Sequence, residues 1–169
     1  LNMIKTFNSL LVTMFSLGKI KFMPGTFGSL ATTIFLFYLF YVLKISSNII
    51  LIGWIIIFIY SFYAVSTHIS DSKNKDPGEI IIDEFLGQSI PIYLYEISHG
   101  TTKEADEAII YYSLFFMLFR YFDIMKPFPV SFFDKNFKNS FGVIMDDICA
   151  GLYVVLTLVC FMIVKSYVL

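Results

Sequence analysis

The apolar run ICAGLYVVLTLVCFMIV, residues 148–164, decides the fold class of this chain. It carries no charged side chain, and its length falls in the range of about 17–25 residues that a helix needs to cross a bilayer. In lipid, every backbone N–H and C=O group must be bonded within the segment, which an α-helix achieves and a lone strand does not. The run therefore predicts a membrane-spanning helix.

Other parts of the chain have the same apolar character. A short segment, residues 85–95, contains Gly87 and Pro91, and at ~1.5 Å per residue its length covers about half of the membrane, so whether it crosses fully stays open. Three longer runs contain no acidic residue, and Arg120 is their one basic residue. These runs, which we predict to be further spans, are residues 28–43, 49–67 and 108–122.

The composition supports this interpretation. Hydrophobic residues make up 57% of the 169 residues, and the mean hydropathy is +0.76. Soluble domains are about 45–50% apolar, so the chain has the composition of an integral membrane protein. We expect an all-α, polytopic membrane bundle of about four to five spans, forming one domain over residues 1–169. With a net charge of −1, we expect no nucleic acid partner, and we infer no obligate protein partner.

The sequence offers little support for thiol or histidine chemistry. Cys149 and Cys160 form no CxxC pair and lie in or beside an apolar run, so we expect neither a disulfide nor a zinc site. No HExxH spacing exists, and we place His68 at the membrane interface and His99 outside, neither of them in catalysis. The patterns GxxxxGK[ST] and GxGxxG are also absent.

Basic residues predict the orientation of the spans. With a cytoplasmic amino terminus, Lys44, Lys103 and Lys165 lie outside and nine basic residues lie inside, as the positive-inside tendency requires. We expect no cleavable signal at this terminus, and we expect the mildly amphipathic segment 6–17 to lie on the membrane surface. The nine inside are Lys5, Lys19, Lys21, Lys73, Lys75, Arg120, Lys126, Lys135 and Lys138.

This orientation gathers five carboxylates at the cytoplasmic boundary. A single acidic residue at a helix start often serves as a cap, and that explanation stays open for Asp83 or Asp147 taken alone. Five carboxylates brought together repel one another unless a cation holds them, and oxygen-only ligands suit Mg²⁺. We therefore predict a Mg²⁺ site formed by Asp83, Glu84, Asp123, Asp146 and Asp147.

Basic side chains accompany these carboxylates. Arg120, Asp123 and Lys126 recur every three residues, which places them on one face of a helix. Pro127 and Pro129 then end this helix. A solvated helix end would explain a lone Arg or Lys, but beside the carboxylates these residues favour a site that binds an anion.

A turn before the first span offers a second possible anion site. In PGTFGS, residues 24–29, backbone N–H groups and the hydroxyls of Thr26 and Ser29 could hold an anion at a helix start. A turn that merely begins the helix explains Pro24 and Gly25 equally well, so both interpretations stay open.

Four motifs follow one another along the chain: PGTFGSL (24–30), DPGEIIIDEFLGQ (76–88), FRYFDIMKPFPV (119–130) and GVIMDDICAGL (142–152). In this order they resemble the motifs of one family. The chain is similar, from about Leu17 to Tyr153, to the phosphatidylglycerophosphatase A family of bacterial membrane lipid phosphatases. The resemblance implies an all-helical, Mg²⁺-dependent enzyme that converts the lipid phosphatidylglycerol phosphate to phosphatidylglycerol by removing its terminal phosphate. It also implies a multi-pass protein of the bacterial inner membrane, surrounded by membrane lipids, with its active site at the cytoplasmic face.

The resemblance assigns roles to residues in these motifs. Asp83, Glu84, Asp123, Asp146 and Asp147 would hold Mg²⁺, and Asp76 is carried over with them by motif. The catalytic set would be Asp83, Asp123, Lys126 and Asp147. The phosphate-binding set would be Gly25, Thr26, Ser29, Arg120 and Lys126.

Hydrolysis of a phosphate monoester is very slow without a catalyst, so charge stabilisation must supply most of the acceleration. Two mechanisms stay open. A water whose pKa the cation lowers could attack, or Asp83 could form an aspartyl phosphate.

Other membrane proteins also use carboxylates at helix ends. CDP-alcohol phosphatidyltransferases carry a long DG…AR…G…D…D signature, which is absent here. Type-2 phosphatidic acid phosphatases need paired histidines with arginine, which the chain lacks. A small ion or metal transporter is the alternative function, although transporters bind their ions near the bilayer midplane rather than at one boundary.

One pattern predicts how two helices meet. Asp83 and Gly87 share the spacing Asp-x-x-x-Gly with Asp147 and Gly151, so each Asp lies one turn from a glycine on the same face. Small residues allow close approach of membrane helices. We expect the helices to cross at the two glycines and to aim both carboxylates at a shared cation, unless each glycine only accommodates another neighbour or a lipid.

Overall fold

The computed structural model describes residues 2–71, 78–99 and 104–168. Within these ranges the chain is helical and has no strands, as predicted, and seven α-helices are joined by one short 3₁₀-helix (η1) and one π-helical turn (η2). The elements are α1 (Asn2–Val12), η1 (Leu17–Lys19), α2 (Pro24–Phe37), η2 (Tyr38–Val42), α3 (Ser47–Asp71), α4 (Ile82–His99), α5 (Ala105–Met125), α6 (Val130–Asn136) and α7 (Ser140–Val168).

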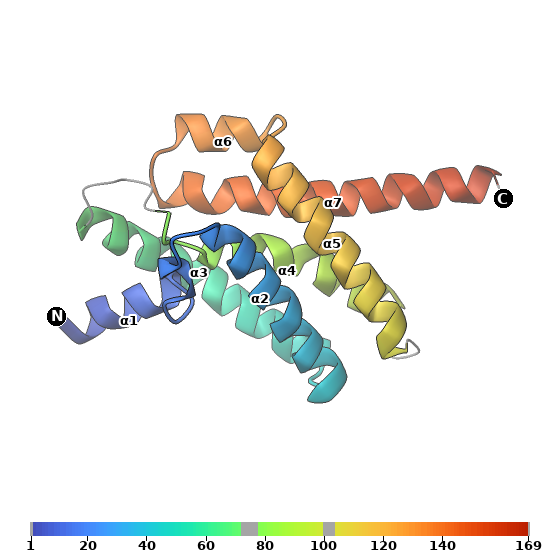
Figure 1. The fold of residues 1–169 in the computed structure, drawn as a ribbon, viewed down its shortest axis with the longest axis horizontal. Coiled ribbons are helices and arrows are strands. Elements are labelled where there is room, and N and C mark those ends of the chain that lie inside the picture. The colour runs from blue at the N-terminus through green and yellow to red at the C-terminus, as the bar shows by residue number, and fades with distance from the viewer. Residues whose placement is uncertain (1, 72–77, 100–103, 169) are drawn as a thin grey trace.

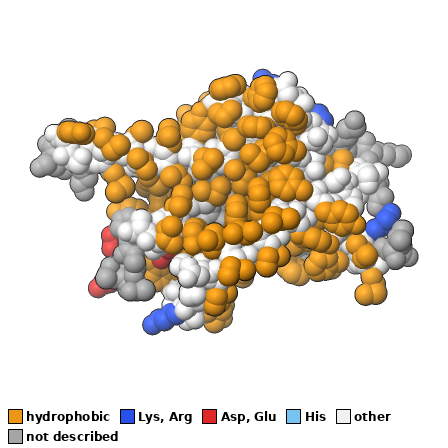
Figure 2. All heavy atoms as spheres, turned by 180° about the vertical axis from the view of Figure 1, so that it is seen from behind, with side chains coloured by type: hydrophobic (Ala, Val, Ile, Leu, Met, Phe, Trp, Pro, Cys, Tyr) orange, Lys and Arg blue, Asp and Glu red, His pale blue; other side chains and the backbone are white. Residues whose placement is uncertain are grey.

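The four predicted spans are confirmed as long helices. In the described part of the chain, four stretches are long and apolar enough to cross a membrane: Pro24–Val42, Ser47–Ser70, Ala105–Met125 and Ser140–Val164. Apolar side chains cover most of the face shown in Figure 2, and charged side chains lie toward its edges. On α3, Ile52, Ile56 and Ile59 are 59–66% exposed. Such exposure would be unfavourable in water and is expected in lipid.

Helix α4 is longer than the segment predicted over residues 85–95. It runs for 18 residues with Pro91 inside it, which corresponds to about 27 Å at 1.5 Å per residue. Proline has no N–H, so the carbonyl of Gly87, four residues earlier, loses its partner within the helix. Packing compensates for this loss, because α4 lies against α7 and α2 along much of its length.

The helices α4 and α7 make backbone contact at Gly87 and Gly151, which confirms the predicted crossing. A Cβ atom added at Gly151 would lie 2.3 Å from the Gly87 carbonyl oxygen and 3.4 Å from the Gly87 Cα atom. A Cβ atom added at Gly87 would lie 2.4 Å from the Asp147 carbonyl oxygen and 2.8 Å from the ring of Phe119. Any larger side chain would separate the helices, so both glycines are required by close approach.

The polar motifs meet at one end of the bundle (Figure 1). The starts of α2, α4 and α7 and the ends of α5 and α6 all contribute to one cavity there. Helix α6 folds back along the first part of α7, and α1 packs against α3. Residues far apart in the sequence are therefore brought together where each helix begins or ends.

We predict that Gly151→Leu lowers the unfolding temperature of the detergent-solubilised protein, because the new side chain would overlap the α4 backbone. Overpacking of this kind costs about 1–3 kcal/mol or more. Gly53→Leu is the matched control: Gly53 lies within α3, and a Cβ atom there would meet nothing within 4 Å. Since glycine is a poor helix former, the control should be neutral or slightly stabilising. Equal unfolding temperatures for the two variants would show that the crossing does not need glycine.

Candidate functional site

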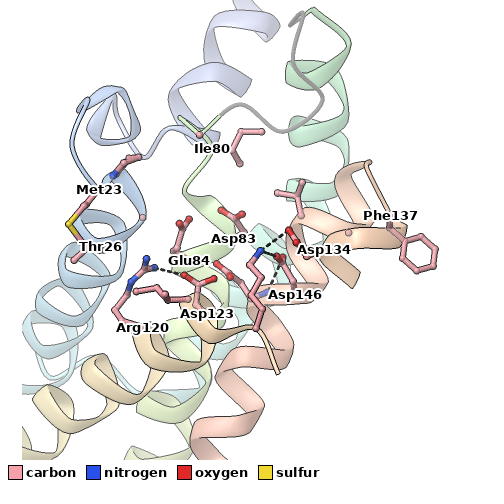
Figure 3. A pocket seen from close by; sticks show the side chains of 18 of the residues that line it. Met23, Thr26, Ile80, Asp83, Glu84, Arg120, Asp123, Asp134, Phe137 and Asp146 are labelled. Atoms are coloured by element: carbon pink, nitrogen blue, oxygen red, sulfur yellow. Dashed lines mark hydrogen bonds and ion pairs between the residues drawn. The ribbon is translucent and has the colours of Figure 1, made fainter. Parts of the chain in front are cut away.

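A polar cavity of about 360 Å³ lies at the end of the bundle where the motifs meet. Figure 3 shows carboxylates from α4, α5, α6 and α7 around it, with the guanidinium of Arg120 among them. The start of α2 closes one side of the cavity through Met23, Pro24, Gly25 and Thr26. The acidic and basic side chains in its lining are Asp83, Glu84, Arg120, Asp123, Lys126, Asp134, Lys138, Asp146 and Asp147.

Three carboxylates form the closest cluster in this cavity. One oxygen from each of Asp83, Glu84 and Asp147 lies within 4.8 Å of the others. Two helices supply them: Asp83 and Glu84 begin α4, and Asp147 lies in the first part of α7, close to the glycine crossing. Oδ1 of Asp83 and Oε2 of Glu84 are buried and have no hydrogen-bond partner among the described residues. Buried carboxylate oxygens without donors are costly, which indicates that this cluster is built to receive a ligand.

Electrostatics lead to the same conclusion. Burial raises the pKa of the Asp83 carboxyl well above its usual range, and the nearby charges of Glu84 and Asp146 raise it further. Burial likewise raises the pKa of the Glu84 carboxyl. A cation bound among these groups would compensate both effects and favour the ionised forms. The donor set is oxygen only, which fits a hard divalent cation such as Mg²⁺.

Next to the cluster, Arg120 faces the start of α2. Its Nη1 atom lies 2.8 Å from Oδ2 of Asp123, and it donates a longer hydrogen bond of 3.4 Å to Oγ of Ser29. Its Nε atom and the Thr26 Oγ1 atom are buried and have no hydrogen-bond partner among the described residues. Gly25 allows Glu84 and Arg120 to approach the start of α2, since a Cβ atom there would lie 2.1 Å from Glu84 Oε1 and 3.3 Å from Arg120 Nη1.

Lys126 joins two elements across the cavity. It follows α5 directly in the left-handed conformation, with φ 45°, so its side chain leaves the direction of the helix. Its Nζ atom lies 2.7 Å from Asp134 Oδ1 on α6 and 3.0 Å from Asp146 Oδ2 on α7. Burial lowers the pKa of Lys126, but the hydrogen bonds and charges of these two carboxylates outweigh it and hold the pKa above its usual range. Lys126 therefore stays charged and ties α6 to α7.

The structure brings together nearly all of the predicted site residues. All five predicted carboxylates line the cavity, together with Gly25, Thr26, Arg120 and Lys126. They are not equivalent, however, because Asp123 and Asp146 form ion pairs while Asp83, Glu84 and Asp147 form the cluster. The predicted roles in catalysis and metal binding stay predictions.

Ser29 differs from its prediction as a phosphate-binding residue. It does not line the cavity, it is fully buried, and its hydroxyl donates to the Gly25 carbonyl oxygen at 2.9 Å. The side chain lies behind the cavity and contacts Arg120, so its place is that of a support for the guanidinium. Asp76 lies outside the described residues.

Asp134 was missed from the sequence. It lies eight residues after Lys126, beyond two prolines, and only the return of α6 along α7 brings it to the lysine. The one signal in the sequence was an acidic residue shortly after the turn of the FRYFDIMKPFPV motif.

His68 pairs with Glu79 at 2.9 Å and does not line this cavity. That position agrees with a histidine outside the site.

Comparisons with known proteins place the chain among lipid phosphatases. The sequence model described as phosphatidylglycerophosphatase A matches residues 10–162. Phosphatidylglycerophosphatase A of Haemophilus influenzae is 37% identical over 87% of this chain and 83% of its own length. Phosphatidylglycerophosphatase A of Escherichia coli K12 is 31% identical over 84% of this chain and 76% of its own length.

A third relative carries a different substrate in its name. A protein of Bacteroides thetaiotaomicron, whose name proposes a phosphatidylinositol-3-phosphatase, is 30% identical over 85% of this chain and 86% of its own length. No solved structure matches the chain significantly. The family model covers most of the chain, including the whole cavity, and on that ground the protein belongs to the phosphatidylglycerophosphatase A family.

Proposed function

We propose that the protein is a Mg²⁺-dependent phosphatase that hydrolyses the terminal phosphate monoester of phosphatidylglycerol phosphate and releases phosphatidylglycerol. The observation that carries the proposal is the cavity itself. It sets a cluster of three carboxylates, suited to a cation, beside two buried donors, Thr26 Oγ1 and Arg120 Nε, that lack partners among the described residues. A phosphate ester that bridges a cation and these donors would satisfy all of these groups.

The two sides of the cavity would divide the work. Asp83, Glu84 and Asp147 would hold Mg²⁺, which when bound would neutralise phosphoryl oxygens and lower the pKa of a water molecule. On the other side, Thr26 and Arg120 would donate hydrogen bonds to the phosphoryl oxygens. A guanidinium presents several donors in a fixed plane, which suits a phosphate group. Stabilisation of charge that develops on these oxygens is the largest expected contribution to the rate.

Asp123 and Asp146 would hold the positively charged side chains of Arg120 and Lys126 in position. Asp123 holds the guanidinium of Arg120 through the 2.8 Å ion pair, and Asp146 holds the ammonium of Lys126 at 3.0 Å. Because Lys126 lines the same cavity, its charge would also favour an anionic headgroup there. The attacking group would be either a water molecule or the Asp83 carboxylate. In the second case the P–O bond to the lipid would break and release phosphatidylglycerol, and water would then hydrolyse the aspartyl phosphate to inorganic phosphate.

The proposed position in the membrane follows from the spans. The cavity lies at the end of the bundle where α2 and α7 begin and α5 ends, so it would meet the headgroup region while the acyl chains lie along the apolar helices. By the excess of basic residues at this end, we propose that it faces the cytoplasm, in the inner membrane of a bacterium. A headgroup phosphate would reach the carboxylates without leaving the lipid surface.

The first prediction of this proposal concerns the reaction. Purified protein in detergent should release inorganic phosphate from phosphatidylglycerol phosphate when Mg²⁺ is present and should release none when EDTA replaces it. Phosphatidylinositol 3-phosphate, presented in the same micelles, is the competing substrate raised by the Bacteroides relative. A lower kcat/KM on phosphatidylglycerol phosphate than on the inositol lipid would reassign the substrate. Full activity in EDTA would show that the reaction needs no divalent cation. If neither lipid releases phosphate, the proposed phosphatase activity is contradicted, and the alternative function of a small ion or metal transporter is favoured.

Variants separate the site from the rest of the fold in that assay. Asp83→Asn and Asp147→Asn should each abolish phosphate release, because each removes a proposed ligand of the cation. Each variant should keep a normal unfolding temperature, because the loss of one negative charge relieves the repulsion among the carboxylates when no cation is bound. His99→Ala is the control and should stay active. An active Asp83→Asn enzyme or an inactive His99→Ala enzyme would contradict the assigned roles.

A second prediction concerns the start of α2. Gly25→Ala should lower kcat/KM about 10- to 100-fold, because the methyl group would displace the Glu84 carboxylate from the cluster and crowd Arg120. The fold should tolerate the change, since the obstructing atom is the end of a flexible side chain. Gly78→Ala is the matched control: Gly78 lines the same cavity, and a Cβ atom there would meet no described residue within 4 Å. Equal activity of the two variants would show that Glu84 does not need its observed position.

A further inference from the structure

A buried glutamine lies one helical turn beyond the carboxylate cluster. Gln88 on α4 is fully buried, and its Nε2 and Oε1 atoms both lack a hydrogen-bond partner in the described part of the chain. It lines neither the polar cavity nor the apolar cavity between α2, α3 and α4. A buried amide without partners is costly, above all between helices that lie in a membrane, where no bulk water is available. This indicates that Gln88 finds its partner in another state of the protein.

Away from the polar cavity, the buried serine and threonine hydroxyls of α2 and α4 have partners, which makes Gln88 an exception. Ser29, Thr32 and Thr33 of α2, which packs against α4, each donate to a carbonyl oxygen four residues earlier. Ser89, next to Gln88, does the same within α4. These hydroxyl donors are thus committed to the backbone of their own helices, so the partner of Gln88 lies elsewhere.

Helix geometry favours Glu84 as this partner. The residues three and four positions from Gln88, which share its helix face, are Glu84, Phe85, Pro91 and Ile92. Glu84 alone among them carries a polar side chain. Side chains on a helix lean toward its amino-terminal end, so Gln88 leans toward Glu84 rather than toward Ile92. Oε2 of Glu84 is itself buried and has no hydrogen-bond partner among the described residues. A donor without an acceptor therefore lies one turn from an acceptor without a donor.

We propose that Gln88 is a positioning residue of the cation site: its Nε2 group donates to the Glu84 carboxylate when Mg²⁺ is bound. Carboxylates that ligate a metal are in turn hydrogen-bonded, and such a bond fixes the oxygen that faces the ion. Rotations of the two side chains would form this bond, since Gln88 Nε2 and Glu84 Oε2 are held by no other hydrogen bond to a described residue. The inference rests on the proposed cation site and adds a residue that lies behind it.

Calorimetric titration of the detergent-solubilised protein with Mg²⁺, without lipid substrate, tests the proposal. Gln88→Met keeps the length of the side chain and removes both polar atoms. We expect this variant to bind Mg²⁺ about 10- to 100-fold more weakly, the usual effect of losing a bond to a ligating carboxylate. In EDTA its unfolding temperature should equal or exceed that of the wild type, because a buried amide without partners has been removed. Gln88→Leu is a second variant, for which we expect the same two results.

Ser89→Ala is the matched control. Ser89 is 2% exposed and follows Gln88 in the helix, but it lines the apolar cavity and donates to the Phe85 carbonyl oxygen. This variant should bind Mg²⁺ as the wild type does. Activity supplies a further readout, because phosphate release by Gln88→Met should approach the wild-type rate as the Mg²⁺ concentration is raised. Damage to the fold would instead lower the rate at every Mg²⁺ concentration.

Three results would overturn this proposal alone. The first is Mg²⁺ binding by folded Gln88→Met and Gln88→Leu that equals wild-type binding. The second is a lower unfolding temperature of both variants in EDTA, which would show that the amide has a partner without the cation. The third is equal weakening by Ser89→Ala, which would show that the effect does not belong to the amide. If the wild-type protein itself binds no Mg²⁺, the proposed cation site is contradicted, and this inference is contradicted with it.

Discussion

The backbone contact between α4 and α7 at Gly87 and Gly151 is the constraint on which the rest of the structure depends. It brings the two helix starts that carry Asp83 and Asp147 close enough for their oxygens to lie within 4.8 Å. Pro91 adds to this arrangement, because it leaves the Gly87 carbonyl without a partner in α4 and that carbonyl lies against Gly151. In lipid, where apolar burial gives helices little reason to associate, such close packing is a main source of specificity.

That contact creates an electrostatic problem which the neighbouring elements solve only in part. Asp123 pairs with Arg120 at 2.8 Å, and Asp146 shares the ammonium of Lys126 with Asp134 at 3.0 Å and 2.7 Å. No comparable cation pairs with Asp83, Glu84 and Asp147 in the described part of the chain, and their burial makes them expensive. The fold thus gives Asp123 and Asp146 cationic partners and leaves the other three carboxylates together, which is the arrangement that the proposed cation site requires.

The features that the sequence predicts correctly are those encoded by patterns within one segment, and the features that it misses depend on contacts between separate segments. The spans follow from long uncharged runs, and the crossing follows from the repeated Asp-x-x-x-Gly spacing, since both are local patterns with one physical meaning in lipid. Helix α4 was expected to be short because Gly87 and Pro91 weaken a helix taken alone, whereas packing against its neighbours decides the outcome. The direction of the Ser29 hydroxyl, which donates to the Gly25 carbonyl oxygen, does not follow from residue spacing. The position of Asp134 beside Lys126 depends on the reversal of the chain between α5 and α6, which residue spacing does not predict either.

The most direct test of the central claim, that Asp83, Glu84 and Asp147 form a cation site, is a calorimetric titration of the purified protein with Mg²⁺ in the absence of any lipid substrate. The account predicts a saturable binding heat for the wild-type protein, and it predicts none when Asp83→Asn and Asp147→Asn are combined in a protein that is still folded. Indistinguishable titrations of the two proteins would contradict it, whether both bind the cation or neither does.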